Sequence, residues 1–375
     1  MPKLFHYRLA LVSLALLLAV ALSGLAKEPT QADLAAAIEQ LASDVFRERD
    51  QACQQLLAGG IAAIPLLEEA VKQPDAEVVT RALGVLEQLA LESPDHMARE
   101  QAVAAVTRLA GVKEGGYASR AETLLEAITA ARRSRAIEEL AELGAKFDWR
   151  PALVGPGFVP AEFALEIGDQ WRGTDDDLQR LSLVSDLRVV SLSGDKFTDA
   201  TLERVVAATA LQSLTLKKTK VTASGLKRLK SLPELQVLDV LYTPLADVDL
   251  VPLADMRQLS LIRLFGTKVS RAAAEKLATA LPNAKVDRRQ GGFLGIGVQP
   301  HPLGCIISNV QPNSAAAGAG IEVGDIVLSL NDKRVGSFED LTAVIGEVAP
   351  TEAVTIELYR GDRRQSLKIK LGEWD

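Results

Sequence analysis

The stretch Gly291-Gly292-Phe293-Leu294-Gly295-Ile296-Gly297-Val298 decides the fold of the last part of this chain. It enters an apolar strand through glycines, so the backbone can turn tightly without interference from Cβ atoms. Consecutive N–H groups in such a turn point into one small concavity, and that concavity favours an anion. The stretch therefore predicts an anion-binding loop that leads directly into a strand.

Three further motifs follow this loop in order. Residues 312–321 are rich in Ala and Gly, residues 323–335 combine a Gly-Asp turn with an apolar strand, and a helical run extends over residues 337–348. Taken together, these residues resemble a PDZ domain of the kind carried by bacterial HtrA-type envelope proteases. The resemblance covers residues 291–375, roughly a quarter of the chain.

The resemblance implies a groove that binds the C-terminal residues of partner proteins. The partner's carboxylate would sit in the glycine loop, and its last residues would add a strand beside residues 296–299. The helical run would form the other wall. The residues expected to bind the peptide are Phe293, Leu294, Gly295, Ile296, Gly297, Val298, Leu341 and Ile345. The alternative is a PDZ domain that only docks against its own chain. Two prolines in residues 299–303 leave a short edge for pairing, which predicts modest affinity.

Composition limits the class of protein. The chain has 375 residues, of which 48% are hydrophobic and 24% charged, as expected for two or three globular domains. A formal net charge of −7 argues against a nucleic-acid partner. Only 4% of residues are aromatic, so aliphatic side chains must build the cores, as in repeat proteins. Cys53 and Cys305 fall in different predicted domains and are expected to be unpaired.

Residues 1–26 have the features of an export signal. Lys3 and Arg8 precede an apolar run over residues 9–22, and small residues stand before a cleavage point after Ala26. The run is short for a membrane span. We therefore expect the mature protein in the periplasm or cell envelope. The alternative is an uncleaved anchor formed by residues 9–26, which would be the chain's only membrane contact.

Residues 27–148 show helical periodicity. Apolar residues recur at spacings of three and four, and breaks fall at Gly59-Gly60, Gln73-Pro74-Asp75, Ser93-Pro94-Asp95 and Gly115-Gly116. Residues 43–52 are echoed about 31 residues later by residues 74–82, with Asp44 and Asp75 expected as N-caps. The segment is similar to HEAT-like helical repeats, which form an α-solenoid.

Residues 149–290 contain a second repeat, in which three sets of apolar positions recur every 24 residues. The sets are Leu187, Leu211, Leu235 and Leu259; Val190, Leu214, Leu238 and Ile262; and Leu192, Leu216, Val240 and Leu264. The pattern resembles a leucine-rich repeat, an α/β solenoid in which each coil has one strand and one helix. Thr219, Thr243 and Thr267 would satisfy backbone groups in the turns between stacked coils.

The sequence also makes predictions about the first coil of this repeat and about its open face. Residues 163–186 lack the strand pattern, so we interpret them as a capping repeat. Alternate strand positions should point outward on the open face. These positions include Ser191, Ser193, Thr215, Lys217, Asp239, Leu241, Arg263 and Phe265. The last two coils would then expose apolar side chains. These would form either a partner site or the surface on which the PDZ domain docks.

Catalytic chemistry finds little support in the sequence. Three histidines, one of them within the export signal, leave almost nothing for a Ser-His-Asp triad or a three-histidine zinc site. A Ser/Lys dyad needs no histidine, but the predicted repeats leave no room for the fold that carries one. The triplet Asp175-Asp176-Asp177 is better explained as an acidic helix start than as a metal site. We therefore expect no enzyme activity, cofactor or metal.

The sequence thus predicts a multidomain protein with a HEAT-like α-solenoid, a leucine-rich α/β solenoid and a PDZ domain of α+β class with a small, partly open barrel. The function favoured is a non-catalytic exported scaffold or adaptor that binds protein C-termini or unfolded peptides. Two rivals remain open. One is a regulatory or substrate-presenting partner of an envelope protease, and the other is a cryptic hydrolase.

Overall fold

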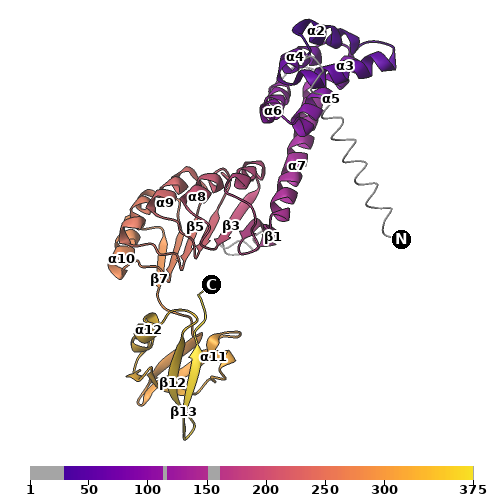
Figure 1. Cartoon of the computed structure of the whole chain (residues 1–375). Coiled ribbons are helices and arrows are strands. Elements are labelled where there is room, and N and C mark those ends of the chain that lie inside the picture. The colour runs from indigo at the N-terminus through magenta and orange to yellow at the C-terminus, as the bar shows by residue number, and fades with distance from the viewer. Residues whose placement is uncertain (1–28, 113–115, 151–160, 375) are drawn as a thin grey trace, which may run out of the picture. The chain divides into compact units, whose positions relative to one another are not determined.

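The computed structural model describes residues 29–112, 116–150 and 161–374 of the chain (Figure 1). The described residues divide into two compact units, with the boundary between Arg135 and Ala136. The predicted export signal lies outside the described residues. Within the described residues, no helix is both long enough and apolar enough to cross a membrane.

The first unit is built from helices. They are α2 (Gln31–Gln40), α3 (Phe46–Gly59), the 3-10 helix η1 (Gly60–Ala63), α4 (Ile64–Val71), α5 (Ala76–Glu92), α6 (His96–Ala110) and the first part of α7 (Ala118–Glu142). Neighbouring helices pack through aliphatic side chains such as Leu34, Leu56, Leu67 and Leu86, all at most 1% exposed. In α6, for example, the buried residues Ala98, Ala102, Ala105 and Leu109 recur at spacings of three and four, so the helix buries one apolar face.

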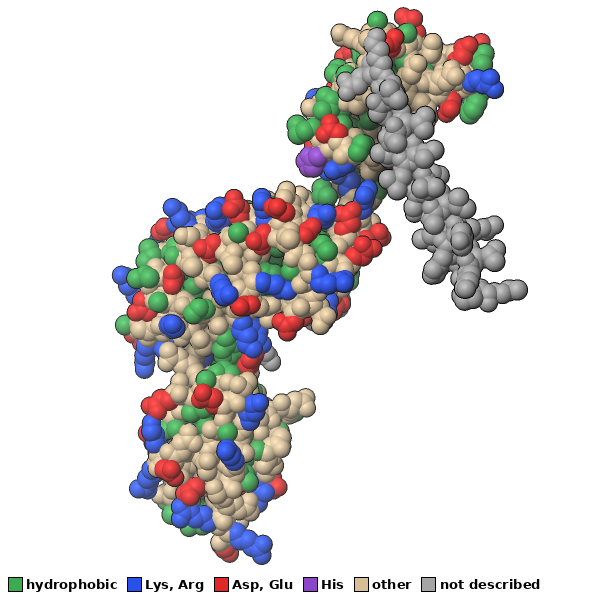
Figure 2. Space-filling view, viewed as in Figure 1, with side chains coloured by type: hydrophobic (Ala, Val, Ile, Leu, Met, Phe, Trp, Pro, Cys, Tyr) green, Lys and Arg blue, Asp and Glu red, His purple; other side chains and the backbone are tan. Residues whose placement is uncertain are grey.

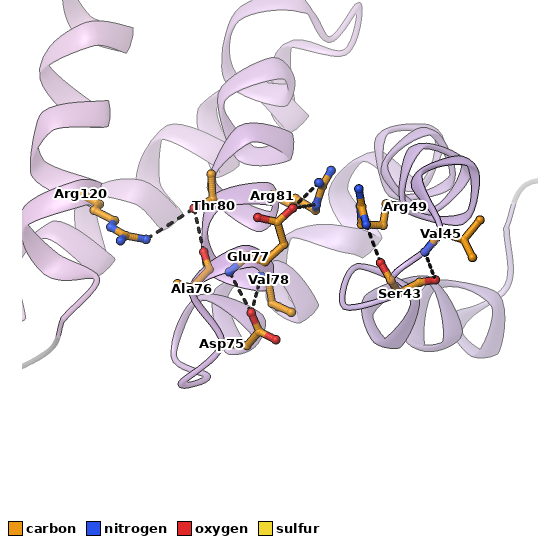
Figure 3. Close-up of polar contacts among 10 residues, drawn as sticks. All are labelled: Ser43, Val45, Arg49, Asp75, Ala76, Glu77, Val78, Thr80, Arg81 and Arg120. Carbon is orange, nitrogen blue, oxygen red and sulfur yellow. Dashed lines mark hydrogen bonds and ion pairs between the residues drawn. The ribbon is translucent and has the colours of Figure 1, made fainter.

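The helix starts confirm one predicted cap and correct another (Figure 3). The Asp75 carboxylate accepts hydrogen bonds from the amides of Glu77 and Val78, at 2.8 and 3.3 Å, and so caps α5. The prediction for Asp44 is wrong. Helix α3 begins one residue later than that cap requires, and Ser43 makes the local contact instead, its hydroxyl accepting from the Val45 amide at 3.1 Å.

The second unit contains a seven-stranded sheet whose strands follow chain order. Its strands are β1 (Lys146–Arg150), β2 (Glu162–Ile167), β3 (Leu187–Ser193), β4 (Ser213–Lys217), β5 (Val237–Leu241), β6 (Leu261–Phe265) and β7 (Lys285–Arg289). Strand β1 pairs antiparallel with β2, and all later neighbours are parallel. Short helices connect the strands and cover one side of the sheet (Figure 1). They are η2 (Asp176–Leu183), α8 (Asp199–Val205), α9 (Ala223–Arg228), η3 (Leu229–Ser231), η4 (Asp247–Asp255) and α10 (Arg271–Ala280).

The register of this sheet follows the 24-residue spacing. Leu214 pairs with Leu238, and Leu238 pairs with Ile262, so equivalent residues lie side by side in β4, β5 and β6. All three side chains are fully buried, between the sheet and the connecting helices. The predicted stacking of these residues is confirmed.

The turns that follow the strands are joined through threonines. The Thr219 amide donates to the Thr243 hydroxyl at 3.1 Å, and the two hydroxyl oxygens also lie 3.1 Å apart. The Thr243 hydroxyl donates in turn to the Leu216 carbonyl at 3.3 Å. The buried Thr267 hydroxyl has no hydrogen-bond partner among the described residues. The predicted role therefore holds for Thr243, whose hydroxyl bonds backbone groups of the preceding coil. The Thr219 hydroxyl bonds the Thr243 hydroxyl, and the prediction fails for Thr267.

Residues 163–186 lack the strand pattern of the later coils, yet they contain most of strand β2, which pairs in parallel with β3 and antiparallel with β1. Phe163 and Leu165 of β2 are buried as in the later strands, although the 24-residue pattern does not reach them. One expectation about this sheet is wrong. Leu241 and Phe265 are not exposed on the open face, since only 5% and 2% of these residues are accessible.

The last part of the chain forms a six-stranded antiparallel sheet with two helices. The elements are β8 (Ile296–His301), β9 (Gly304–Val310), α11 (Ala315–Gly318), β10 (Ile326–Leu330), β11 (Lys333–Arg334), α12 (Phe338–Gly346), β12 (Ala353–Arg360) and β13 (Arg363–Lys370). The strand order is β13-β12-β10-β9-β8, with β11 paired to β10, so β8 stands at an edge. Aliphatic side chains from the sheet and from α12 form one core.

Candidate functional site

The glycine loop that precedes β8 has the backbone geometry expected of an anion-binding turn. Gly295 has φ = +81° and Gly291 has φ = +71°, in a region that other residues rarely adopt. A Cβ on Gly295 would lie 2.2 Å from the Cβ of Ser314. A Cβ on Gly291 would lie 1.9 Å from the carbonyl oxygen of Ile345, in α12. Both glycines are therefore required by the backbone path.

Among the described residues, the carbonyl groups of Leu294 and Gly295 have hydrogen-bond partners, whereas their amides do not. The Leu294 carbonyl accepts from the Ala316 amide at 3.0 Å, and the Gly295 carbonyl accepts from the Gln311 amide at 2.8 Å. The amides of Leu294 and Gly295 have no acceptor among the described residues. Both residues are buried, so a carboxylate, which is a strong acceptor, would have to enter the loop to reach these two adjacent N–H groups.

Strand β8 offers a free edge directly after this loop. Among the described strands it pairs only with β9, from Ile296 opposite Val310 to His301 opposite Gly304. Pro300 lies within the strand and has no amide to donate, so the edge is best suited to pairing near Ile296 and Val298. An extended peptide can add a strand there through main-chain hydrogen bonds.

Helix α12 carries the apolar residues predicted for the opposite wall. Leu341 and Ile345 are 2% and 7% exposed, and both belong to the core that also contains Leu294. Ile296 and Val298 are partly buried against the same core. The structure therefore groups the predicted residues around one apolar region. Whether Leu341 and Ile345 contact a bound peptide remains a prediction.

Sequence reasoning missed Phe338, the first residue of α12. The residue is 53% exposed, an unusual state for a phenylalanine. It precedes Leu341 by three residues and Ile345 by seven, which is the spacing of one helix face. The signal was present in the sequence, since the apolar pattern of residues 337–348 begins at this position.

Phe293 differs from the rest of the loop because it already has partners. Its amide donates to the Gly372 carbonyl and its carbonyl accepts from the Gly372 amide, both at 2.8 Å. Its ring centroid lies 4.6 Å from that of Trp374. Gly372 and Trp374 were not among the predicted site residues, since nothing in the sequence connects positions this far apart.

The charged groups near the domain core form structural pairs. Arg360 binds the Asp325 carboxylate through two hydrogen bonds of 2.8 and 2.7 Å, and Asp325 is only 2% exposed. Burial alone raises the pKa of Asp325, but bonds from Arg360 and from the Glu322 amide outweigh it and hold the pKa below its ordinary value. This pair fixes the Gly-Asp turn before β10 and leaves no free base there.

The described residues contain no group of three or more His, Cys, Asp or Glu side chains that could hold a metal ion. Both cysteines are free, and burial raises the pKa of the Cys305 thiol, which makes its reactive thiolate scarcer. In the Asp175–Asp177 triplet, Asp177 accepts from the Thr174 amide at 2.8 Å and Asp175 accepts from the Thr201 hydroxyl at 2.6 Å.

Comparison with known proteins agrees with this geometry. Residues 292–371 match the PDZ domain family. The periplasmic serine endoprotease DegP of Escherichia coli strain K12 is 38% identical over 108 residues, which are 29% of this chain and 19% of that protein. DegP of Salmonella typhimurium is 37% identical over 108 residues, 29% of this chain and 18% of that protein.

A solved structure of the serine endoprotease from Yersinia pestis is 28% identical, with a TM-score of 0.22, over 28% of this chain and 36% of that one. The chain thus spans about a fifth of the length of the curated relatives. The likeness supports a C-terminal PDZ domain of the HtrA/DegP type, a protein-binding module, in a multidomain chain whose first part is helical.

Proposed function

We propose that this protein is a non-catalytic, exported scaffold or adaptor whose PDZ domain captures the apolar C-termini of partner proteins. The observation that carries the proposal is the conjunction of two unpartnered loop amides, at Leu294 and Gly295, with the free edge of β8. The amides suit a carboxylate, and the edge suits the strand that precedes it. In this proposal the exposed Phe338 forms the neighbouring apolar wall together with Leu341 and Ile345, which are 2% and 7% exposed.

The remainder of the chain would present surfaces for partners. We propose that residues 27–148 form HEAT-like repeats and residues 149–290 a leucine-rich repeat solenoid. Helices packed in sequence support the first assignment, and parallel strands paired at 24-residue offsets support the second. Figure 2 shows basic and acidic side chains interspersed on the face in view. Together with the net charge of −7, this supports protein partners over nucleic acid.

The decisive test of peptide capture compares one peptide made twice, as the free acid and as the C-terminal amide. A fluorescein-labelled ten-residue peptide ending in Val would be titrated against the full chain by fluorescence polarisation. We expect a dissociation constant on the order of micromolar for the acid, about −8 kcal/mol. The amide should bind at least about tenfold more weakly, because it lacks the charge that the loop amides bind. Equal binding of acid and amide would show that the groove does not read chain ends.

Export and the absence of catalysis have separate tests. N-terminal sequencing of protein extracted from the cell envelope should begin at Lys27, whereas a chain that keeps Met1 in the membrane fraction would indicate an anchor. Incubation of the purified protein with an unfolded substrate should leave the substrate intact. Cleavage that survives removal of contaminating proteases would favour a hydrolase.

One rival function has a specific observation behind it. The curated relatives that match part of this chain are periplasmic serine endoproteases, so the matched segment occurs in proteins that carry out proteolysis. In this alternative, the chain would bind unfolded C-termini and present them to an envelope protease. Addition of the chain should then accelerate substrate cleavage by that protease. An unchanged rate would favour the scaffold.

A further inference from the structure

Two residues that follow β13 contact the open face of the seven-stranded sheet. The Glu373 carboxylate pairs with Lys217 at 2.9 Å and with Lys218 at 2.5 Å. Glu373 is 22% exposed at its side chain, so the contact is largely covered. Burial alone raises the pKa of Glu373, but the two lysines outweigh it and hold the pKa below its ordinary value. The negative charge of the Glu373 carboxylate is therefore paired with the positive charges of Lys217 and Lys218.

The neighbouring residue, Trp374, fits an aromatic position on the same face. Its ring centroid lies 5.9 Å from that of Phe265, in a tilted arrangement. The Arg289 guanidinium lies 4.6 Å from the Trp374 centroid and 4.9 Å from the Phe265 centroid, so one cation contacts both rings. The Trp374 amide also donates a hydrogen bond to the Tyr242 hydroxyl. These contacts explain why Phe265 is buried.

The repeat itself arranges these groups. Lys217, Leu241, Phe265 and Arg289 occupy the same register position in β4, β5, β6 and β7. One row of the sheet therefore presents a cation, an apolar side chain, an aromatic ring and a second cation in order. We refer to Lys217, Lys218, Tyr242, Phe265 and Arg289 as the seat. Its charges suit an acidic residue at one end, and its rings suit an aromatic residue at the other.

We propose that the seat is a second peptide-binding site, for an acidic residue followed directly by an aromatic one, and that Glu373-Trp374 is its resident, exchangeable ligand. Exchange is feasible because the seat does not satisfy every polar group of Glu373-Trp374. The buried indole N–H of Trp374 has no acceptor among the described residues. Lys218 is 52% exposed, so its ion pair with Glu373 is screened by solvent.

Occupation of the seat affects the PDZ loop through Phe293. That residue pairs with Gly372 through its backbone and with Trp374 through its ring. A competing peptide that displaces Trp374 would remove the ring contact and leave the backbone pairing. This consequence for the groove rests on the proposed function. The seat itself does not, because none of its residues belongs to the carboxylate loop.

The test uses the full chain and a labelled peptide of residues 369–375, acetylated and amidated so that its ends carry no charge. Wild-type protein is compared with the Glu373→Gln/Trp374→Ala double variant, whose seat lacks its resident ligand. A tethered ligand acts at an effective concentration on the order of millimolar. The peptide should therefore bind the double variant about tenfold more tightly than the wild type.

Variants of the seat, made in the double-variant background, provide the controls. Lys218→Gln and Arg289→Gln should each weaken peptide binding severalfold. Lys220→Gln is the matched control, since Lys220 pairs with Asp195 at 3.1 Å and does not contact Glu373. Circular dichroism confirms that each variant is folded. Equal peptide affinity for wild type and double variant, or binding that ignores Lys218 and Arg289, would overturn the proposal. Neither result would bear on capture of free C-termini by the PDZ groove.

Discussion

Substitution of Gly295 by Ala should abolish most peptide binding while leaving the chain folded. Gly295 has φ = +81°, and a residue with a Cβ costs about 1–2 kcal/mol in this left-handed region. The new Cβ would also lie 2.2 Å from the Ser314 Cβ and 2.6 Å from its hydroxyl oxygen. Overpacking of this kind typically costs about 1–3 kcal/mol. The combined strain is about 2–5 kcal/mol, which the loop can relieve only by moving.

Movement of the loop displaces the Leu294 and Gly295 amides from the positions that would bind a carboxylate. If only about 2 kcal/mol of the strain appears in binding, affinity falls about 30-fold. The assay is fluorescence polarisation with the free-acid peptide ending in Val, and thermal unfolding monitors folding. Gly318→Ala is the matched control, because a Cβ there meets nothing within 4 Å. Equal peptide affinity of the Gly295→Ala and Gly318→Ala variants would refute the assignment of this loop.

Two further predictions concern the seven-stranded sheet and its seat. Leu238→Ala should destabilise β4–β6 by about 2–5 kcal/mol, since Leu238 is fully buried. Hydrogen exchange of the amides in these strands measures the free energy of opening. Lys220→Ala is the control and should change this free energy little, because the Lys220 side chain is 63% exposed. The contact of Glu373 with its lysines should persist above the ordinary glutamate pKa of about 4.3 and weaken as pH falls through the lowered value, because protonation removes the charge. Iodide quenching of Trp374, taken as the difference between wild type and Trp374→Phe, should then rise as the pH falls below the ordinary glutamate range. Unchanged quenching would contradict the assignment.

The stacked strands and the glycine loop were predictable because their determinants are local or periodic. In a parallel sheet with equal repeats, residues 24 positions apart must meet, so Leu214, Leu238 and Ile262 could be placed together from spacing alone. The conformation of residues 291–296 depends on glycines that adopt positive φ, and those are visible in the sequence. Strand β2 escaped notice because it stands outside the periodic pattern.

Tertiary structure decided what covers the open face. By alternation alone, Leu241 and Phe265 point away from the helices, and the sequence therefore predicts that they are exposed. The burial of Phe265 depends partly on Trp374, more than one hundred residues away, and on the guanidinium of Arg289. No periodic signal reports such a contact, because the 24-residue spacing does not extend to the segment that contains Trp374. Sequence determines which face a side chain occupies, whereas only the folded chain brings a distant segment to that face.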